Sequence, residues 1–474
     1  MKTCFFSSKS LVAVSVFFVF FLQTNSLAAK SQIFRSRLFP LEKGSLEEAL
    51  FKDTSDGQLN RVSFELACLI ASGIHDQSFM SYIKRIDNYQ NRISLETSIS
   101  NKQPAKKAEI ILSWLHQNAL LYYTEEACSL DVLLSTGRYN CVSSTILLYI
   151  LGERFNLSLK GLQTHDHVCA ILLDGKRKLE IQTTTPYGAR TQHISKNSRN
   201  TNKTPGFPRE TGKLGLIASI YYNKGVLTLQ DGKKHKALSN FCRAYELDPD
   251  YPGLEVLVVS LFCQVGNIYF EKSKYQSSIQ LMKEGLKFAR SNSSKSLRAT
   301  LINNISASYG SWTQKTIEAK NWSKARNILR KGLNNLPRNS ILLSQLRYVN
   351  WKWIESYSEQ RKWNKAIQIY NESQKNLPDD DILIKQANHI YNNWGLHLLD
   401  DGHYEKALTV LRKGKRLSED PVFLHNIKCV YAKKTEQLLN EGKTNQAFLW
   451  LKKGSKETGD KTFLSLAKNL AGKT

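Results

Sequence analysis

The stretch that organises the first part of this chain reads Thr136-Gly-Arg-Tyr-Asn-Cys-Val-Ser-Ser-Thr145. Cys141 follows a glycine-containing turn and begins an apolar run from Val142 to Leu151, which predicts a helix. The sulfur of Cys141 is therefore expected at a helix N-terminus, where free N–H groups and the helix dipole favour a thiolate. Because the thiolate is the nucleophilic form of cysteine, Cys141 is a candidate nucleophile. The alternative is a buried structural cysteine.

A β-hairpin is predicted after this helix. Val168-Cys-Ala-Ile-Leu-Leu173 is rich in strand-forming residues, Asp174-Gly175 is a turn signal, and Lys178 to Thr184 reads as the return strand. His167 then heads one strand and Gln182 ends the other. A base within reach of a thiol, itself oriented by a third side chain, is the general arrangement of an activated nucleophile.

The order Cys141, His167, Gln182 resembles the transglutaminase-like superfamily of cysteine enzymes, which shares the papain-like catalytic core. The motifs that carry the resemblance are G-R-x-x-C, D-H-V and x-x-T-T, within about residues 105–188. The resemblance implies an α+β domain of helices plus a small antiparallel sheet. It also implies that Cys141 is the nucleophile and His167 the general base, with no cofactor and no metal.

The third catalytic position departs from the family pattern, because it is usually Asp and here falls on Gln182. Gln can hydrogen-bond His167 and fix its tautomer, but it supplies no charge to stabilise an imidazolium. Glu180 shares the strand parity of Gln182 and is the alternative acid, while Asp166 could orient His167 locally. The sequence leaves this third role open.

The N-terminus has the three parts of a secretory signal peptide. Lys2 precedes the apolar run Leu11–Leu22, and Ser26-Leu-Ala28 supplies small residues, so cleavage after Ala28 is expected. The run is too short to span a membrane, and no other stretch approaches that length, so no transmembrane segment is expected after cleavage. The mature protein is predicted to be exported, periplasmic or secreted.

Seven cysteines follow the predicted cleavage site, and none forms a C-x-x-C pair. This spacing excludes a disulfide scaffold and a structural zinc site, and the odd number leaves at least one thiol unpaired.

The predicted N-terminal domain covers residues 29–188. Residues 43–100 read as helical, and a further helix begins at Pro104, where the missing N–H of proline costs nothing. His116 in that helix is interpreted as an exposed or half-buried residue without a catalytic role. Residues 189–212 are rich in polar residues and proline, which predicts a linker and a domain boundary.

Residues 213–474 contain an internal repeat. The positions Tyr221, Gly225, Gly232, Ala237, Phe241, Ala244 and Pro249 match the tetratricopeptide repeat (TPR) pattern. One small residue recurs every 40 to 47 residues, at Ala237, Ser278, Ala325, Ala366, Ala407 and Ala447. About six helix pairs with long helices are therefore predicted, stacked into an all-α superhelix with a concave groove.

The repeat region is strongly basic, because residues 206–474 have 43 Lys plus Arg against 24 Asp plus Glu. Such a balance indicates either a solvated helix face or a surface for an acidic protein or an anionic envelope polymer. Nucleic acid is not expected, since the chain is predicted to be exported and has no nucleic-acid-binding motif.

Two functions are compatible with these observations. The first is an exported thiol enzyme, a cysteine peptidase, amidase or transamidase. It would act on a protein or peptide substrate through Cys141, His167 and Gln182 or Glu180, and the repeats would hold the substrate or a partner. The alternative is a non-catalytic TPR scaffold for protein–protein interaction with a degenerate transglutaminase-like domain, which the Gln at the acid position favours.

Overall fold

The structure is a computed structural model that describes residues 44–164, 166–189, 192–193 and 208–471. The predicted signal peptide, His165 and most of the predicted linker lie outside these ranges. The chain divides into two compact units, Met1–Lys272 with Gln280–Leu301 and Ser273–Ile279 with Ile302–Thr474. Unit 1 and unit 2 are described separately below.

The N-terminal part of unit 1 is helical, as the sequence predicts, and its helices surround α7. The helices are α2 (Ser45–Asp53), η1 (Thr54–Asp56), α3 (Phe64–Ser72), α4 (Phe79–Glu96), α5 (Pro104–Asn118), α6 (Leu130–Thr136) and α7 (Cys141–Arg154). Every residue of α7 from Val142 to Gly152 is buried. A helix that is apolar all round belongs in a core, so α7 is held on several sides by other elements. It contacts α5, α6 and the sheet.

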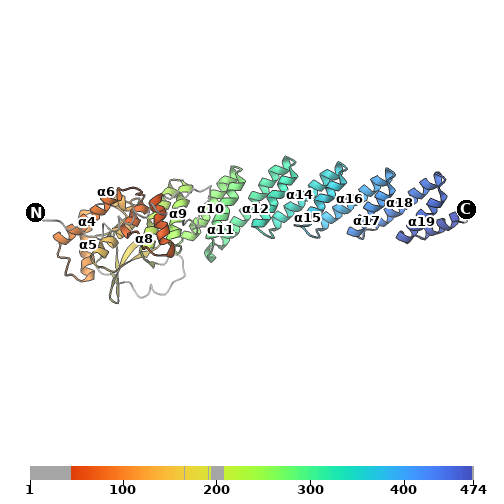
Figure 1. Ribbon diagram of the computed structural model, residues 1–474. Helices are drawn as coiled ribbons and strands as arrows, with labels where there is room; N and C mark the ends of the chain where they lie inside the picture. Colours follow the sequence, from red (N-terminus) through yellow and green to blue (C-terminus); the bar gives the residue numbers. More distant parts are fainter. Residues whose placement is uncertain (1–43, 165, 190–191, 194–207, 472–474) are drawn as a thin grey trace. The chain divides into compact units, whose positions relative to one another are not determined.

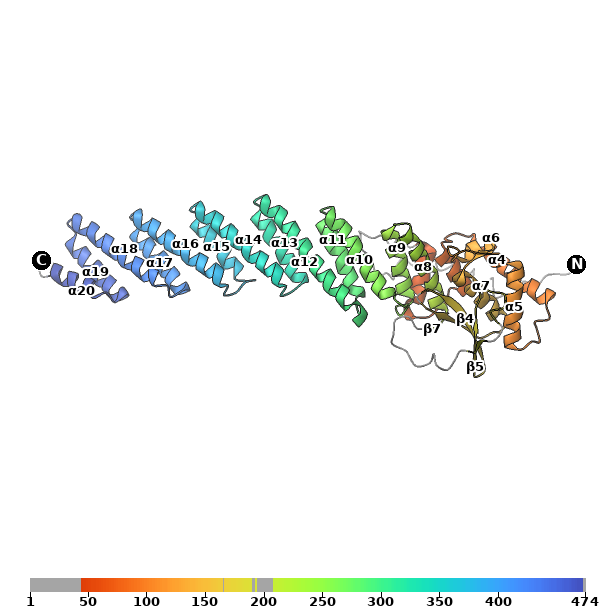
Figure 2. The same cartoon turned by 180° about the vertical axis from the view of Figure 1, so that it is seen from behind.

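The antiparallel sheet has the order β6-β5-β4-β3-β7. Its strands are β3 (Leu159–Gln163), β4 (Val168–Asp174), β5 (Arg177–Ile181), β6 (Gln192–His193) and β7 (Arg209–Thr211). The predicted hairpin is confirmed as β4 and β5, with Asp174 opposite Arg177, and Gln182 lies one residue beyond the end of β5. Strand β4 packs on α5 and α7 (Figure 2). A separate pair, β1 (Tyr122–Tyr123) and β2 (Arg138–Tyr139), leads into α7.

The prediction of a linker over residues 189–212 is corrected by the two edge strands. Strand β6 pairs with β5, and β7 pairs with β3, so both ends of that stretch belong to the sheet. The polar composition misleads here because both strands are short and lie at the edges of the sheet, and the β7 residues are only half-buried, so few apolar side chains are needed. Arg209 of β7 donates a hydrogen bond to Gln163 Oε1 at 2.8 Å and forms an ion pair with Asp248.

The boundary between the units also differs from the predicted one, because unit 1 includes the first repeat helices. These are α8 (Lys213–Gln230), α9 (Lys234–Leu247) and α10 (Leu254–Glu271) (Figure 1). Arg243 of α9 donates to both carboxylate oxygens of Glu47 in α2, at 2.8 and 3.0 Å, and Tyr221 Oη donates to the same carboxylate at 2.6 Å. Lys224 Nζ of α8 donates to the carbonyl oxygen of Ala71 in α3 at 3.0 Å. The first repeat is thus fixed to the N-terminal helices by buried polar contacts.

Helix α10 is an exception to the prediction that no stretch after the signal peptide approaches the length of a membrane span. It is 18 residues long, and among the described residues it alone has the length and hydropathy of a membrane span, with 44% of that window buried. It packs on α9, and its buried face includes Val258 and Phe262, as in a core helix of a repeat protein.

Unit 2 continues the helix pairs, and the division between the units falls within α11 (Tyr275–Phe288) and α12 (Lys295–Glu318). The following helices are α13 (Trp322–Asn335), α14 (Ser340–Glu359), α15 (Trp363–Ser373), α16 (Asp381–Asp400), α17 (Tyr404–Leu417), α18 (Pro421–Asn440), α19 (Thr444–Thr458) and α20 (Lys461–Ala471). The recurring small residues Ala325, Ala366, Ala407 and Ala447 are fully buried. Complete burial is what we expect of small residues at positions where the two helices of a repeat pack closely. The first helices of these pairs have 20 to 24 residues, which accounts for the long repeat spacing.

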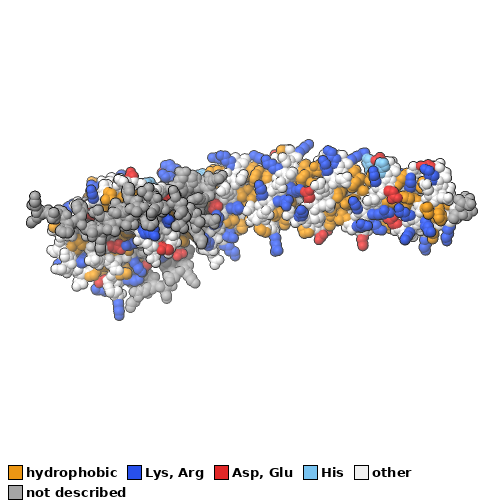
Figure 3. All heavy atoms as spheres, viewed as in Figure 1, with side chains coloured by type: hydrophobic (Ala, Val, Ile, Leu, Met, Phe, Trp, Pro, Cys, Tyr) orange, Lys and Arg blue, Asp and Glu red, His pale blue; other side chains and the backbone are white. Residues whose placement is uncertain are grey.

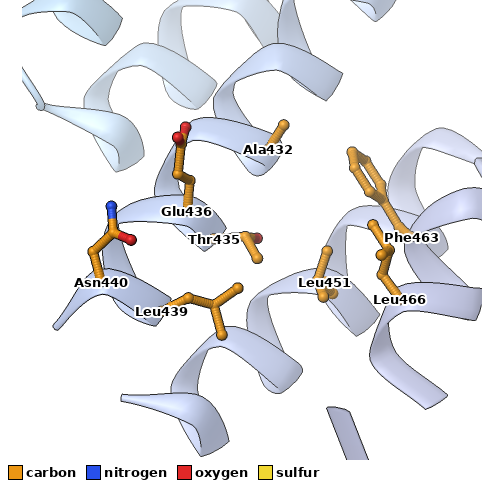
Figure 4. A pocket seen from close by; sticks show the side chains of 8 residues that line it. All are labelled: Ala432, Thr435, Glu436, Leu439, Asn440, Leu451, Phe463 and Leu466. Atoms are coloured by element: carbon orange, nitrogen blue, oxygen red, sulfur yellow. The ribbon is translucent and has the colours of Figure 1, made fainter. Parts of the chain in front are cut away.

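The last helix, α20, packs on α19 and covers part of the final pair. Figure 4 shows a hollow of about 250 Å³ between α18, α19 and α20, with Leu439, Leu451 and Leu466 in its lining. Leu466 is 51% exposed, so α20 leaves an apolar surface of its own.

Candidate active site

The first turn of α7 is fixed by its N-cap residue, Asn140. Its side-chain oxygen accepts hydrogen bonds from the N–H groups of Val142 at 2.9 Å and Ser143 at 3.2 Å, and Ser143 Oγ accepts from the Asn140 N–H. This reciprocal arrangement is a capping box, which satisfies orphan donors of the first turn. Cys141 is the first residue of the helix and is half-buried, as the sequence predicts.

The structure brings Cys141, His167 and Gln182 together. His167, just before β4, lies near enough to Cys141 for the thiol to be the main cause that raises the pKa of the imidazole. Its Nε2 lies 2.8 Å from Gln182 Oε1. Because Gln182 occupies Nε2, Nδ1 is the nitrogen that remains for the thiol. The three residues that the sequence predicts as site residues therefore lie together, with His167 between Cys141 and Gln182.

The charge state of His167 follows from these contacts. The hydrogen bond to Cys141 raises the pKa of His167 to about 9, Gln182 adds to this effect, and burial opposes it. A hydrogen bond or charge that favours the protonated imidazole acts in this direction, whereas desolvation disfavours it. At neutral pH His167 is therefore protonated, because the neighbouring Cys141 side chain favours the positive charge of the imidazolium.

Glu180 lies behind Gln182 and does not replace it. Gln182 Nε2 donates a hydrogen bond to Glu180 Oε1, and Glu180 also hydrogen-bonds Cys169. The question that the sequence left open, Gln182 or Glu180, thus has a geometric answer. The amide contacts His167, and the carboxylate contacts the amide.

Thr183 is a site residue that the sequence argument missed. Its hydroxyl lies 2.8 Å from Ser144 Oγ and 2.9 Å from Thr145 Oγ1, both in α7. Its carbonyl oxygen lies 3.0 Å from Nε2 of His116, the residue that was given no role. Thr183 is 1% exposed. The signal in the sequence was the run Ser143-Ser-Thr145, separated from Cys141 by one residue, whose hydroxyls need partners in a buried helix.

Asp166 shapes the turn that carries His167. Its carboxylate accepts a hydrogen bond from Thr164 Oγ1 at 2.7 Å, and the same hydroxyl accepts from the His167 N–H at 2.9 Å. Asp166 therefore orients His167 through the backbone, and its charge is the weakest of the contributions to the pKa of that imidazole. His165 lies outside the described residues.

The other thiols are in different environments. Cys68, Cys128, Cys169, Cys242 and Cys263 are buried, whereas Cys141 and Cys429 are half-buried. Burial raises the pKa of Cys128 and of Cys169 to about 12, so these thiols stay protonated. Cys429 Sγ lies 3.7 Å from His425 Nε2 in the middle of α18. In the described part of the chain, no group of three His, Cys, Asp or Glu side chains could hold a metal ion.

A second candidate site lies in unit 2, where cationic and aromatic side chains meet. A hollow of about 280 Å³ is lined by Arg361, Lys362, Trp363, Asn364, Lys365 and Trp394. Arg361 lies 2.9 Å from His397 Nε2, and Lys362 donates to Gln360 Oε1 at 2.7 Å. In these hydrogen bonds the partner of each cation is an imidazole or an amide and not a carboxylate. Figure 3 shows Lys and Arg side chains spread among hydrophobic ones over the repeat helices.

Comparison with known protein families identifies the type of the first repeat. Residues 218–251 match a tetratricopeptide repeat family model. These residues comprise most of α8 and all of α9. No curated protein matches the chain.

Solved structures that match the chain have low overall similarity to it. One is menin, in a structure described as revealing its binding site for Mixed Lineage Leukemia protein, with 9% identity over 64% of this chain and 87% of that chain and a TM-score of 0.30. A second is the TPR2AB domain of yeast Sti1 in a pHSP90 complex, with 16% identity, coverage of 54% and 97%, and a TM-score of 0.17. A third is a tetratricopeptide repeat protein of Parabacteroides merdae, with 15% identity, coverage of 54% and 98%, and a TM-score of 0.15. The family model therefore places a TPR-type repeat at residues 218–251, and further helix pairs follow it along the chain.

Proposed function

We propose that this protein is a repeat-based interaction protein whose unit 2 binds a protein or peptide partner rich in Asp and Glu. TPR-type solenoids present extended surfaces that serve binding rather than chemistry. The observation that carries the choice of partner is the hollow formed by Arg361, Lys362 and Lys365 beside Trp363 and Trp394.

The charges of this hollow favour an acidic ligand. Asp401 is the carboxylate nearest to Arg361 in the hydrogen-bond network, but it contacts His397 Nδ1 at 2.8 Å and leaves the guanidinium to the other ring nitrogen. Residues 302–474 contain 29 Lys plus Arg against 16 Asp plus Glu, so the surrounding field is also positive. Carboxylates of a partner would pair with the cations, and its apolar side chains would cover the indole rings.

The test is binding of fluorescent Glu-rich peptides to the full-length protein, followed by anisotropy at several salt concentrations. The double substitution Arg361→Glu/Lys362→Glu should weaken binding by at least about tenfold, or ~1.4 kcal/mol, because like charges then face each other. Lys375→Glu is the matched control, since Lys375 is exposed beyond the C-terminal end of α15, away from the hollow. Equal affinity of the double variant and the wild type would exclude this hollow as the binding site.

We propose a second function for unit 1, thiol chemistry on amide bonds in a transglutaminase-like domain. The specific observation that favours it is the position of His167, whose Nε2 lies 2.8 Å from Gln182 Oε1 and whose pKa is raised mainly by Cys141. The Cys141 thiolate would attack the carbonyl carbon of an amide and form a tetrahedral intermediate, and the His167 imidazolium would give its proton to the departing amine. A thioester would remain. Water or a second amine would then attack it, with His167 taking the proton and the thiolate leaving.

The backbone of α7 provides one group for the developing oxyanion. Asn140 Oδ1 accepts from the N–H groups of Val142 and Ser143 and leaves the Cys141 N–H, at the positive end of the helix dipole, for the substrate oxygen. Gln182 contributes orientation without charge, so hydrolysis by this site should be slower than by a site with a carboxylate there.

The test of this second function is hydrolysis or transamidation of a set of unstructured peptides by the wild type and by Cys141→Ala. Activity that disappears in the variant would support the thiol enzyme. If the wild type and Cys141→Ala have equal hydrolysis and transamidation activity, the thiol function is excluded. Peptide binding by unit 2 would then support the interaction function as the only one of the two.

Export remains part of the proposal for the whole chain. It is supported by the apolar run Leu11–Leu22 and the small residues up to Ala28. N-terminal sequencing of the protein recovered from its producing cells should give Ala29 as the first residue, and an intact Met1 would contradict it.

A further inference from the structure

We propose that Glu180 is a positioning residue that acts on His167 through Gln182, by fixing which end of the Gln182 amide faces the imidazole. The proposal rests on the thiol function of unit 1. It replaces the choice between Gln182 and Glu180 with a series: Cys141, His167, Gln182, Glu180.

The direction of each hydrogen bond in the series is set by chemistry. An ionised carboxylate can only accept hydrogen bonds, so the group of Gln182 that faces Glu180 must be its NH₂. The other end of the amide, Oε1, is then the atom 2.8 Å from His167 Nε2. A carbonyl oxygen can only accept, so Nε2 must carry a hydrogen. Nδ1 is consequently the nitrogen that exchanges a proton with Cys141.

Without Glu180, the Gln182 amide would have two orientations of nearly equal shape. If the NH₂ group faced His167, it could not accept from Nε2–H and would favour an unprotonated Nε2. Nδ1 would then carry the hydrogen of a neutral ring, and the imidazolium would lose its hydrogen-bond acceptor. An amide at the third position therefore needs a carboxylate behind it, whereas a carboxylate there would not, because both its oxygens accept.

Glu180 is itself held in place. It lies in β5, opposite Ile171 of β4 and Gln192 of β6, so its backbone is in the interior of the sheet. Burial raises the pKa of the Cys169 thiol, which is 2% exposed, and Glu180 is close enough for its carboxylate to add to this effect, so the carboxylate lies against the buried part of the sheet.

The contacts of His167 also argue against direct action of Glu180. The side chain that hydrogen-bonds His167 Nε2 is Gln182, and the hydrogen bond of Glu180 in the site is the one that it accepts from Gln182. Glu180 reaches the site only by contact with Gln182. It is therefore a positioning residue and not a second general base.

The experiment uses the full-length protein with ¹⁵N-labelled histidine and compares Glu180→Gln with the wild type. Two quantities are measured, the rate of Cys141 alkylation by iodoacetamide as a function of pH and the ¹⁵N shifts of His167. Loss of an outer orienting partner is expected to slow alkylation at pH 7 by on the order of 10-fold. The His167 titration midpoint should fall as well. Glu210→Gln is the control, because Glu210 is a carboxylate of the same sheet that pairs with Lys160 and Lys178 and does not contact the site.

The swap variant Gln182→Glu/Glu180→Gln provides the decisive comparison. It keeps the total charge and the number of amides, and it places a carboxylate against His167, so both quantities should return to the wild-type values or exceed them. Wild-type behaviour of Glu180→Gln would overturn the proposal. So would a loss in Glu180→Gln that the swap does not restore, because that outcome indicates a merely structural role. Failure of the thiol function itself would be seen separately, as an unreactive Cys141 in the wild type.

Discussion

Thr183 Oγ1 lies 2.8 Å from Ser144 Oγ, and this contact joins the end of β5 to the first turn of α7. Gln182 precedes Thr183 and Cys141 stands three residues before Ser144, so the contact sets the distance between the two ends of the catalytic series. His116 supports it from α5 through the Thr183 carbonyl. A pair of buried hydroxyls, outside the candidate residues Cys141, His167 and Gln182, therefore joins the end of β5 to the helix.

Replacing Thr183 by Val should destabilise unit 1 and slow Cys141 alkylation. The side chain keeps its shape, and the buried hydroxyls of Ser144 and Thr145 lose one partner but still donate to backbone carbonyls, so the cost is about 0.5–1.5 kcal/mol. Urea unfolding and iodoacetamide kinetics measure the two effects. Thr184→Val, at the half-buried next position, serves as the control and should change neither. Unchanged stability of Thr183→Val would mean that the contact contributes nothing.

Cys141 should be alkylated before any other cysteine in the native protein. Cys429 is equally half-buried and has a neighbouring histidine, but it lies within α18, without the free N–H groups of a helix start. The five buried thiols should follow only on unfolding. Time-resolved peptide mass spectrometry gives the order, and labelling of Cys429 ahead of Cys141 would count against a thiolate at Cys141.

His167 should titrate near pH 9, well above the ordinary value of 6.5. Its folded-state pKa is raised, so the contact stabilises the fold fully below about pH 6.5 and loses its effect as the pH rises through about 9. Cys141→Ala removes the main cause and should bring the midpoint down, which NMR of the histidine ring will detect. The stability difference between the two proteins should vanish above pH 9. A midpoint that is the same in both would show that the thiol does not bond the ring.

Glu47→Gln should destabilise unit 1 strongly. The Arg243 side chain is 11% exposed and that of Glu47 is 6% exposed, so the substitution removes the charge of a carboxylate that pairs with a buried cation. Breaking such a pair costs about 3–5 kcal/mol.

Thermal unfolding with Asp231→Asn as the control tests this expectation. The pair of Asp231 with Lys233 is more than half exposed on both sides, and such pairs contribute about 0–1 kcal/mol. A similar small effect for both variants would show that the first repeat does not depend on the Glu47 contact.

Much of the architecture could be predicted from local pattern. The helix that begins at Cys141 follows from an N-cap asparagine before an apolar run, and the hairpin follows from strand-forming residues around Asp174-Gly175. The helix pairs follow from small residues that recur where helices approach closely, such as Ala366 and Ala407. In each case residues near one another in the chain carry the information.

The errors concerned residues whose partners are distant in the chain. The stretch 189–212 has a linker-like composition, yet Gln192–His193 and Arg209–Thr211 are strands because the exposed edges of β5 and β3 accept them. Unit 1 likewise extends beyond the predicted boundary and includes the first repeat. Contacts such as that between Glu47 and Arg243, which are 196 residues apart, join this repeat to the N-terminal helices.

The sequence by itself determined the types of the site residues, their order along the chain and the local elements that carry them. Those properties depend on side-chain chemistry and on periodicity, both of which are written in the linear order. Only the tertiary structure decided that Gln182 faces His167 while Glu180 faces Gln182, and that Thr183 joins Ser144. The reason is physical: strand parity places Glu180 and Gln182 on the same face, and only the pairing of β5 with β4, which carries His167 at its start, selects which of them reaches the imidazole.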